Sequence, residues 1–405
     1  MKRFLAALFA ALTVFSLTGC AKVEYPAEPA QPDPPAVTPA PEEPELSPEE
    51  IAEQEQLAVE RVREEKRQAL LDSMTLEEKI GQLFFVRYPA DNAVEDISTY
   101  HLGGYLLFSR DYKDDDNWLT RDQFTQKMQS YQDAAAIPLF IGSDEEGGTV
   151  TRASRNPNLF SEKFKSPQTI YSTGGMEALA QDALNKSQAL LDLGINVNFA
   201  PVCDVSADPN DFIYDRTLGQ DAETTAEYVT RTVLTMGDAG ELAVLKHFPG
   251  YGNNADTHTG IAVDDRPMEA FENSDLLPFK AGIEADAPFV LVSHNIVSCM
   301  DPDLPASLSP AVHKVLRETC GFDGIAITDD LAMDAVKAYA KDGAVAVMAL
   351  QAGNDMVITT DYRTQIPAVI EAVKNGTLEE SVIDIACLRV LKCKDAHMCI
   401  PSLYS

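Results

Sequence analysis

The chain has 405 residues, of which 45% are hydrophobic, and its 64 acidic against 32 basic residues give a formal net charge of −32. This composition is that of a soluble protein with enough apolar residues to bury a sizeable core. Such a large negative charge argues against nucleic acids and other anionic polymers as partners, because the surface repels them.

The N-terminus has the pattern of an export signal. Two basic residues precede an apolar run at 4–17, which is followed by small residues and Cys20. The run is too short for a comfortable membrane-spanning helix. Residues 17–20, LTGC, resemble a bacterial lipobox, which implies cleavage before Cys20 and a diacylglycerol on its thiol. We therefore expect a signal peptide at 1–19 and an exported protein, lipid-anchored on the outer side of the cell membrane.

The next segment, 20–50, is predicted to be a disordered tether. It is rich in proline and glutamate and has no basic residue after position 22, so it cannot bury a core. Ser47 and Pro48 are typical of a helix start, with the serine as the cap. A charged helix is expected at 51–73, serving either as a stalk or packing on the domain that follows.

From Met74 onward, short apolar runs alternate with amphipathic helical stretches. The runs do not alternate with polar residues, which favours a sheet buried on both faces. The expected strands are 83–87, 104–108, 138–143, 197–202, 243–248, 289–294, 324–328 and 355–358. The helical stretches are 121–135, 175–193, 222–239, 276–285, 309–319, 341–351 and 363–374. Eight such units predict one (β/α)₈ TIM-type barrel over 74–405. A doubly wound open sheet is the competing architecture.

Polar and ionisable residues lie at or just after the carboxyl ends of these strands. In a β/α barrel those ends share one rim, where active sites are built. The residues are Asp144, Glu145, Lys246, His247, His294, Asp329 and Asp330. An aspartate that ends a strand could attack an electrophilic carbon, which we predict for Asp329, whereas Asp330 is expected to cap the following helix.

The glycine-rich loop at 246–258, KHFPGYGNNADTH, contains Asp256 and His258 two residues apart. Their side chains meet only if the loop folds back on itself. A carboxylate that holds an imidazole fixes its tautomer and raises its basicity, which suits proton transfer to a leaving oxygen. The alternative is a solvated, inert Asp-x-His pair on a surface loop.

Four motifs together resemble glycoside hydrolase family 3, in its β-N-acetylhexosaminidase branch. Besides the loop at 246–258, they are MTLEEKIGQL at 74–83, SDEEGGTVTR at 143–152 and GFDGIAITDDLAM at 321–333. They occur in the family order, and the resemblance covers about Met74 to Cys393. It departs from many members in one place: the loop has three residues, not four, between Gly252 and Asp256.

The resemblance implies a role for each matching position. Asp329 matches the catalytic nucleophile, His258 the acid/base and Asp256 its orienting partner. The implied substrate-binding residues are Asp144, Arg152, Arg216, Lys246 and His247. The implied reaction is retaining exo-hydrolysis of terminal β-linked N-acetylglucosamine, or another N-acetylhexosamine, from glycosides. Cell-wall fragments are the expected substrates, and the protein is expected to be a monomer that needs no metal and no cofactor.

Three other functions stay open from the sequence. Two are enzymes of the same family, a β-glucosidase and an N-acetylglucosaminide phosphorylase, since a histidine acid/base does not repel phosphate. The third is a sugar-binding lipoprotein of an importer, which would have two α/β lobes and no need for Asp329.

The remaining cysteines form no CxxC pair, so a zinc site is not expected. Cys203 and Cys299 end strand-like runs and are expected to be buried free thiols. Export permits disulfides, and Cys393 could pair with Cys399.

Overall fold

The structure is a computed structural model, and it describes residues 47–254, 262–337, 339, 345–398 and 400–403. The chain divides into two units, Met1–Glu55 and Gln56–Ser405. The described residues of the first unit, 47–55, form the start of helix α1 (Pro48–Ser73), which begins at the proline that the sequence indicated. Within the described residues, no helix has the length and apolar character needed to cross a membrane.

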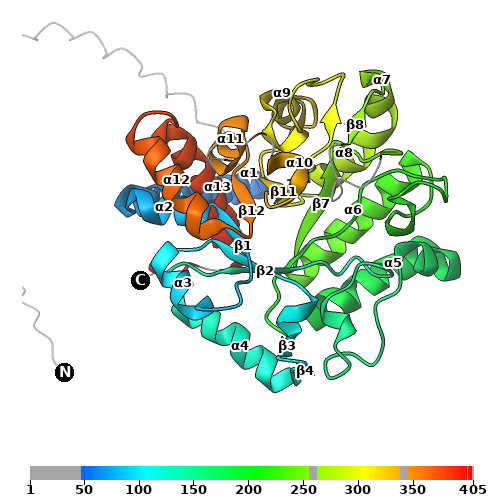
Figure 1. The fold of residues 1–405 in the computed structure, drawn as a ribbon, viewed down its shortest axis with the longest axis horizontal. Coiled ribbons are helices and arrows are strands. Elements are labelled where there is room, and N and C mark those ends of the chain that lie inside the picture. Colours follow the sequence, from blue (N-terminus) through cyan, green and yellow to red (C-terminus); the bar gives the residue numbers. More distant parts are fainter. Residues whose placement is uncertain (1–46, 255–261, 338, 340–344, 399, 404–405) are drawn as a thin grey trace, which may run out of the picture. The chain divides into compact units, whose positions relative to one another are not determined.

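The second unit contains a closed barrel of eight parallel strands with helices outside it (Figure 1). In chain order the strands are β1 (Phe84–Arg87), β2 (Gly104–Leu107), β5 (Phe140–Ser143), β6 (Val197–Asn198), β7 (Leu242–Phe248), β9 (Phe289–Val292), β11 (Ile325–Asp330) and β12 (Met356–Thr359). Each pairs with its neighbour in sequence, and β1 closes the ring on β12. The predicted TIM-type barrel is confirmed. The open doubly wound sheet and the two-lobed binding protein do not fit this topology.

Helices follow most of the strands and cover the outside of the barrel (Figure 1). After α1, they are α2 (Leu76–Gln82), α3 (Ala93–Tyr100), α4 (Arg121–Ala134), α5 (Pro167–Leu191), α6 (Ala222–Ala239), α7 (Met268–Ala270), α8 (Leu276–Glu284), α9 (Pro310–Lys314), α10 (Asp334–Lys337), α11 (Val345–Ala352), α12 (Tyr362–Lys374) and α13 (Glu380–Met398). Short pairs, β3 (Lys113–Asp114) with β4 (Asn117–Trp118) and β8 (Val263–Asp264) with β10 (Ile296–Val297), lie in loops. The sequence patterns did not single out α2, α3 and α13.

The barrel interior is filled with aromatic side chains. Phe85 stacks on Phe140 and meets Phe199 edge to face, and Phe140 meets Phe289 in the same way. Toward the amino ends of the strands, the buried Lys394 of α13 donates hydrogen bonds to Gln82 Oε1 at 2.8 Å and to the Gly103 carbonyl at 2.9 Å. These residues precede β1 and β2, so they close the barrel at the end opposite the carboxyl rim.

Two barrel strands carry irregular register at that rim. The pairing of β7 with β9 shifts between Leu245 and Phe248, and the pairing of β11 with β12 shifts between Ile327 and Asp330. A bulge re-aims the side chains next to it. Both shifts therefore sit where the candidate site residues leave the sheet.

The part of α1 within the second unit packs on the C-terminal segment. Arg67, 3% exposed, donates to Asp395 Oδ2 of α13 at 2.9 Å, and Lys66 Nζ donates to the Leu403 carbonyl at 2.6 Å. Residues 56–73 are therefore part of the folded domain and not a projecting stalk.

Candidate active site

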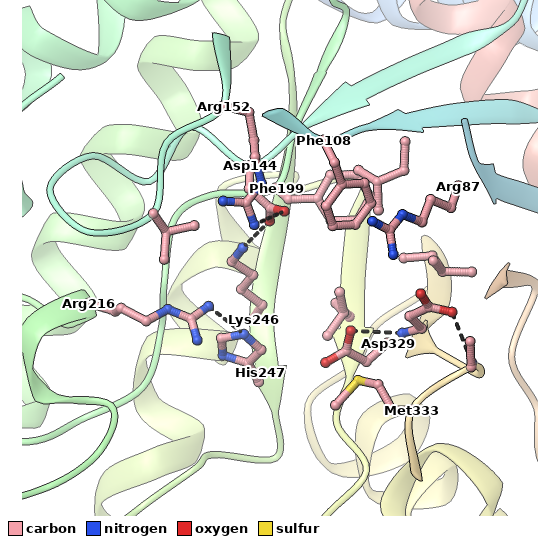
Figure 2. A pocket seen from close by; sticks show the side chains of 16 residues that line it. Arg87, Phe108, Asp144, Arg152, Phe199, Arg216, Lys246, His247, Asp329 and Met333 are labelled. Atoms are coloured by element: carbon pink, nitrogen blue, oxygen red, sulfur yellow. Dashed lines mark hydrogen bonds and ion pairs between the residues drawn. The ribbon is translucent and has the colours of Figure 1, made fainter. Parts of the chain in front are cut away.

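A cavity of about 420 Å³ opens at the carboxyl ends of the barrel strands (Figure 2). Its lining residues are Arg87, Leu106, Phe108, Asp144, Val150, Arg152, Phe199, Arg216, Lys246, His247, Leu291, Asp329, Asp330, Ala332, Met333 and Ile358. Leu106, Phe199, Leu291 and Ile358 come from the strands or their ends and form an apolar floor. The sequence predicted eight catalytic or substrate-binding residues, and six of them line this one cavity. The other two, Asp256 and His258, lie outside the described residues.

One side of the cavity, which we call the network wall, consists of the lining residues Asp144, Arg216, Lys246 and His247 together with Glu146, which is buried behind them. Lys246 Nζ contacts Asp144 Oδ1 at 2.8 Å and Glu146 Oε1 at 2.6 Å. Arg216 holds the same Glu146 with two hydrogen bonds, from Nε at 2.9 Å and from Nη2 at 2.7 Å. Two cations therefore share one buried carboxylate.

The charge of Glu146 is stabilised by this arrangement. Burial alone would raise the pKa of its carboxyl, but the charges of Arg216 and Lys246 outweigh burial and hold the pKa far below its usual range. The pKa of Arg216 is raised correspondingly: burial opposes its charge, and the Glu146 carboxylate more than compensates. Both shifts favour the charged forms, so the pair is ionised at neutral pH.

His247 extends the network to a second buried carboxylate. Arg216 Nη2 lies 3.0 Å from His247 Nε2, and His247 Nδ1 lies 2.7 Å from Asp204 Oδ2. A guanidinium has donors only, so His247 Nε2 must accept the hydrogen bond from Arg216. His247 Nδ1 therefore carries the proton and donates a hydrogen bond to Asp204. The other Asp204 oxygen accepts from the Tyr251 backbone N–H at 2.7 Å. Asp204 thus fixes the imidazole and the start of the following loop together.

The opposite side, the nucleophile wall, consists of Arg87, Phe108, Asp329, Asp330 and Met333. Asp329 Oδ1 accepts a hydrogen bond from the Asp330 backbone N–H at 2.8 Å. Figure 2 shows the Asp329 carboxylate at the cavity, across from Lys246 and His247. Its position at the end of β11 matches the one predicted for the nucleophile.

Asp330 also lines the cavity, and its predicted role as a helix cap is wrong. It is the last residue of β11, and its Oδ1 accepts from the Ala332 backbone N–H at 2.9 Å, whereas α10 begins only at Asp334. It therefore closes a turn. Burial raises the pKa of Asp330, and the nearby Asp329 charge adds to this while Arg87 opposes it.

Arg152 joins the cavity through a loop that Glu145 supports from below. Arg152 Nη2 contacts Asp144 Oδ2 at 3.3 Å. Glu145 is buried, and its carboxylate accepts from the backbone N–H groups of Arg152, Ala153 and Ser154. Glu145 therefore does not line the cavity, contrary to its expected place at the rim. The strand-end pattern could not distinguish a side chain that faces the cavity from one that turns beneath it.

His294 is the second rim residue that does not line the cavity. It is fully buried, with Nδ1 2.7 Å from Ser307 Oγ and Nε2 3.1 Å from the Asp330 carbonyl. Its visible contacts support the backbone of β11 next to the candidate nucleophile.

The loop that follows β7 is anchored on a buried ion cluster. Arg266 contacts Asp264 at 2.7 Å and Asp275 at 2.9 Å, and Asn254 Nδ2 donates to Asp264 Oδ2 at 2.9 Å. Gly252, with φ of 56°, passes so close to Arg266 that a Cβ there would lie 2.5 Å from its Nη2. The two ends of the segment that contains Asp256 and His258 are thus fixed on one cluster.

Sequence reasoning missed three residues of the site: Glu146, Asp204 and Arg87. Each stands at or just beyond the carboxyl end of an expected strand, so the strand-end rule could have found them. Glu146 lies inside the motif at 143–152, Asp204 follows the run at 197–202, and Arg87 ends the run at 83–87.

Among the described cysteines, Cys203 is buried as expected, but Cys299 is exposed, so that expectation is wrong. Cys299 lies beyond β10, in a loop outside the barrel wall. Cys399 and Cys20 lie outside the described residues. In the described part of the chain, no three His, Cys, Asp or Glu side chains are arranged to hold a metal ion.

Comparison with known proteins identifies the family. Residues 75–393 match the model "Glycosyl hydrolase family 3 N terminal domain". A protein of Mycobacterium tuberculosis named beta-hexosaminidase LpqI is 31% identical over 330 residues, which are 78% of this chain and 82% of that protein. A beta-hexosaminidase of Xanthomonas oryzae pv. oryzae is 34% identical over 70% of this chain and 83% of its own.

Solved structures agree with this result. A family 3 β-N-acetylglucosaminidase from Paenibacillus has a TM-score of 0.74 and 30% identity over 80% of this chain, which spans only 63% of that protein. A family 3 glycosyl hydrolase from Mycobacterium smegmatis has a TM-score of 0.70 and 31% identity over 80% of this chain and 98% of its own. The resemblance seen in the sequence is confirmed: the chain belongs to glycosyl hydrolase family 3.

Proposed function

We propose that this protein is a retaining exo-β-N-acetylhexosaminidase that removes terminal β-linked N-acetylglucosamine from glycosides. The observation that carries the proposal is the placement of Asp329 at the rim, in one cavity with Asp144, Lys246 and His247. The names of the family 3 relatives, beta-hexosaminidase and β-N-acetylglucosaminidase, support the substrate class. The cavity volume falls within the range of about 300–1,000 Å³ that is usual for small-ligand sites.

In the proposed reaction, the network wall holds the hydroxyl groups of the sugar. Its charged groups are already hydrogen-bonded to one another, so binding requires little rearrangement. Asp329 attacks the anomeric carbon, and the leaving oxygen takes a proton from His258. Water, deprotonated by the same histidine, then releases the sugar from the glycosyl-enzyme ester.

A histidine suits this exchange of roles. Its ordinary pKa of about 6.5 allows it to donate and accept a proton near neutral pH without strong desolvation. It also adds no second negative charge beside the Asp329 carboxylate. Asp256 is proposed to orient it. No metal or organic cofactor takes part in these steps.

The test is turnover of 4-nitrophenyl N-acetyl-β-glucosaminide and of the matching β-glucoside by the wild type. We expect strong preference for the first, with the β-anomer as the initial product by NMR. Equal or better use of the glucoside would indicate the family 3 β-glucosidase instead. Acceleration by inorganic phosphate, with N-acetylglucosamine 1-phosphate as the product, would indicate the phosphorylase.

We further propose that the protein is exported and attached to the membrane through a diacylglycerol on Cys20. The support is the LTGC sequence that ends the apolar N-terminal run. An enzyme held there would meet cell-wall fragments as substrates. Expression in a bacterial host should place the wild type in the detergent phase after phase separation, and the Cys20→Ala variant should lose incorporation of a labelled fatty acid. Equal labelling of both would contradict the anchor.

A further inference from the structure

Arg87 is a cation of the active-site cavity that no step above uses. It ends β1 and lines the cavity, with its guanidinium carbon 4.1 Å from the centre of the Phe108 ring. Figure 2 shows the guanidinium pointing into the cavity beside that ring. The stacking fixes the plane of the guanidinium and leaves its edge, which carries the N–H donors, open to a ligand.

Among the described residues, Arg87 makes neither a hydrogen bond nor an ion pair, and its Nε is buried without a hydrogen-bond partner. Asp330 does not pair with it: the charge of Arg87 lowers the pKa of Asp330, but the Asp330 oxygens accept from the Ala332 N–H and the Thr360 hydroxyl. Arg152 makes an instructive contrast. It lies 5.4 Å from the same Phe108 ring and is paired with Asp144.

The barrel topology places Arg87 across the cavity from the network wall. In the closed strand order, β12, β11 and β9 separate β1 from β7 on one side, and β2, β5 and β6 separate them on the other. Arg87 on β1 therefore stands diametrically opposite Lys246 and His247 on β7. The guanidinium of Arg87 and the network wall therefore line the cavity from opposite sides of the barrel.

The guanidinium of Arg87 lines the cavity without a carboxylate partner among the described residues, so a ligand that supplies an anionic acceptor there is favourable. The planar fork of a guanidinium matches carboxylate and phosphate groups, which accept two parallel hydrogen bonds. We propose that Arg87 binds an oxyanion that enters the cavity with the substrate: a carboxylate or phosphate group carried on the leaving-group side of the cleaved bond. This inference rests on the proposed function, and free phosphate is the other source of the same chemistry.

The experiment compares two aryl N-acetyl-β-glucosaminides, one with a neutral 4-nitrophenyl leaving group and one with 3-carboxy-4-nitrophenyl. Arg87→Met should lower kcat/KM for the carboxylated substrate by about 10-fold more than for the neutral one, the worth of a charge-assisted hydrogen bond. Arg87→Lys should restore part of the loss, since it keeps the charge but not the fork. Using the variant-to-wild-type ratio for each substrate cancels the different leaving-group chemistry.

Arg231→Met is the matched control, because Arg231 pairs with Glu227 on the exposed surface of α6. It should alter neither substrate. An equal loss on both substrates in Arg87→Met would overturn the proposal and assign Arg87 to positioning Asp330. Failure of the wild type on both substrates would instead count against the proposed function.

Calorimetry tests whether Arg87 binds an oxyanion without relying on turnover. Inorganic phosphate and the carboxylated glycoside are titrated into Asp329→Ala, which should not turn the glycoside over, and into the same variant carrying Arg87→Met. Loss of glycoside binding in the variant supports the site with a substrate-borne anion, and loss of phosphate binding alone supports it with a free one. Binding of neither probe, or binding that survives Arg87→Met, overturns it.

Discussion

The two walls of the cavity handle charge in different ways. On the network wall every cation that lines the cavity is already paired: Lys246 with Asp144 and Glu146, and Arg216 with Glu146. On the nucleophile wall, Arg87 has no ion pair to a described residue, and Asp329 and Asp330 stand side by side. A paired wall presents fixed donors and acceptors to a ligand, whereas Arg87 on the opposite wall is the cation that we propose to bind the anionic leaving group.

The largest effect is expected on the nucleophile wall. Asp329→Ala removes the attacking oxygen, so kcat for an aryl N-acetyl-β-glucosaminide should fall by at least about 10⁴-fold, as for other nucleophile deletions. Asp330→Ala, the matched control one residue away, removes contacts with the Ala332 N–H and the Thr360 hydroxyl but not the attacking oxygen, so it should retain far more activity. Equal losses in the two variants would contradict the assignment of the nucleophile. Circular dichroism of both checks the fold.

The second-largest effect on activity is expected from His258, which is not one of the residues that define the two walls. His258→Ala should slow turnover by about 10² to 10⁴-fold, the usual contribution of general acid–base catalysis. Substrates with a leaving group that needs little protonation should lose less in the glycosylation step. The measurement is kcat/KM across a series of aryl leaving groups of differing pKa. A loss that is the same for every leaving group would exclude His258 as the proton donor.

On the network wall, Glu146→Gln keeps the shape but removes the charge shared by Lys246 and Arg216. We expect kcat/KM to fall by about 10²-fold and the free energy of unfolding by about 3 kcal/mol, since breaking a buried pair leaves its partners uncompensated. Glu145→Gln is the matched control, because Glu145 supports backbone N–H groups and contacts neither cation. If Glu145→Gln impaired kcat/KM as much, the network would have no special role in binding. Denaturant titration gives the stability change.

The smallest effect concerns a carboxyl behind the network wall. Burial raises the pKa of Glu241 to about 7; it accepts from Ser187 Oγ at 2.7 Å, its Oε1 has no partner, and it shares a small internal cavity with Glu146. Its pKa is raised on folding, so its stabilising contribution is complete below about 4.5 and is lost as pH rises through 7.

Replacing Glu241 by glutamine removes that dependence. Relative to the wild type, Glu241→Gln should gain up to about 3 kcal/mol in free energy of unfolding between pH 5 and pH 8, the equivalent of the raised pKa. Urea unfolding at the two pH values measures it. The exposed Glu227→Gln should show no such change, and a Glu241→Gln curve parallel to the wild type would disprove the buried titration.

The sequence predicted the barrel well because buried parallel strands have a simple sequence pattern. They are apolar runs at regular spacing, and each ends in polar residues. It predicted the cavity less well because strand ends do not reveal orientation. Alternation would send Lys246 and His247 to opposite faces, yet both line the cavity, where β7 shifts its register. The same holds for Asp329 and Asp330 on β11.

The wrong or missed sequence predictions at the carboxyl rim of the barrel have one physical origin. Glu145 and His294 occur where site residues are expected, but they turn into the protein and hold backbone that the site needs. Asp204 and Glu146 were missed although they orient the residues that the motifs named. Such supporting roles depend on contacts between segments far apart in the chain, which a local pattern does not contain.

The aromatic filling of the barrel has a consequence for the order of events in each turnover. Phe199 forms part of the cavity floor, and Phe85, Phe140 and Phe289 continue the packing toward the end that Lys394 closes. Among the described residues, this packing closes the base of the pocket. The freed sugar must therefore leave through the opening by which the glycoside entered, so a long chain cannot slide onward and each cut requires a fresh encounter with a chain end.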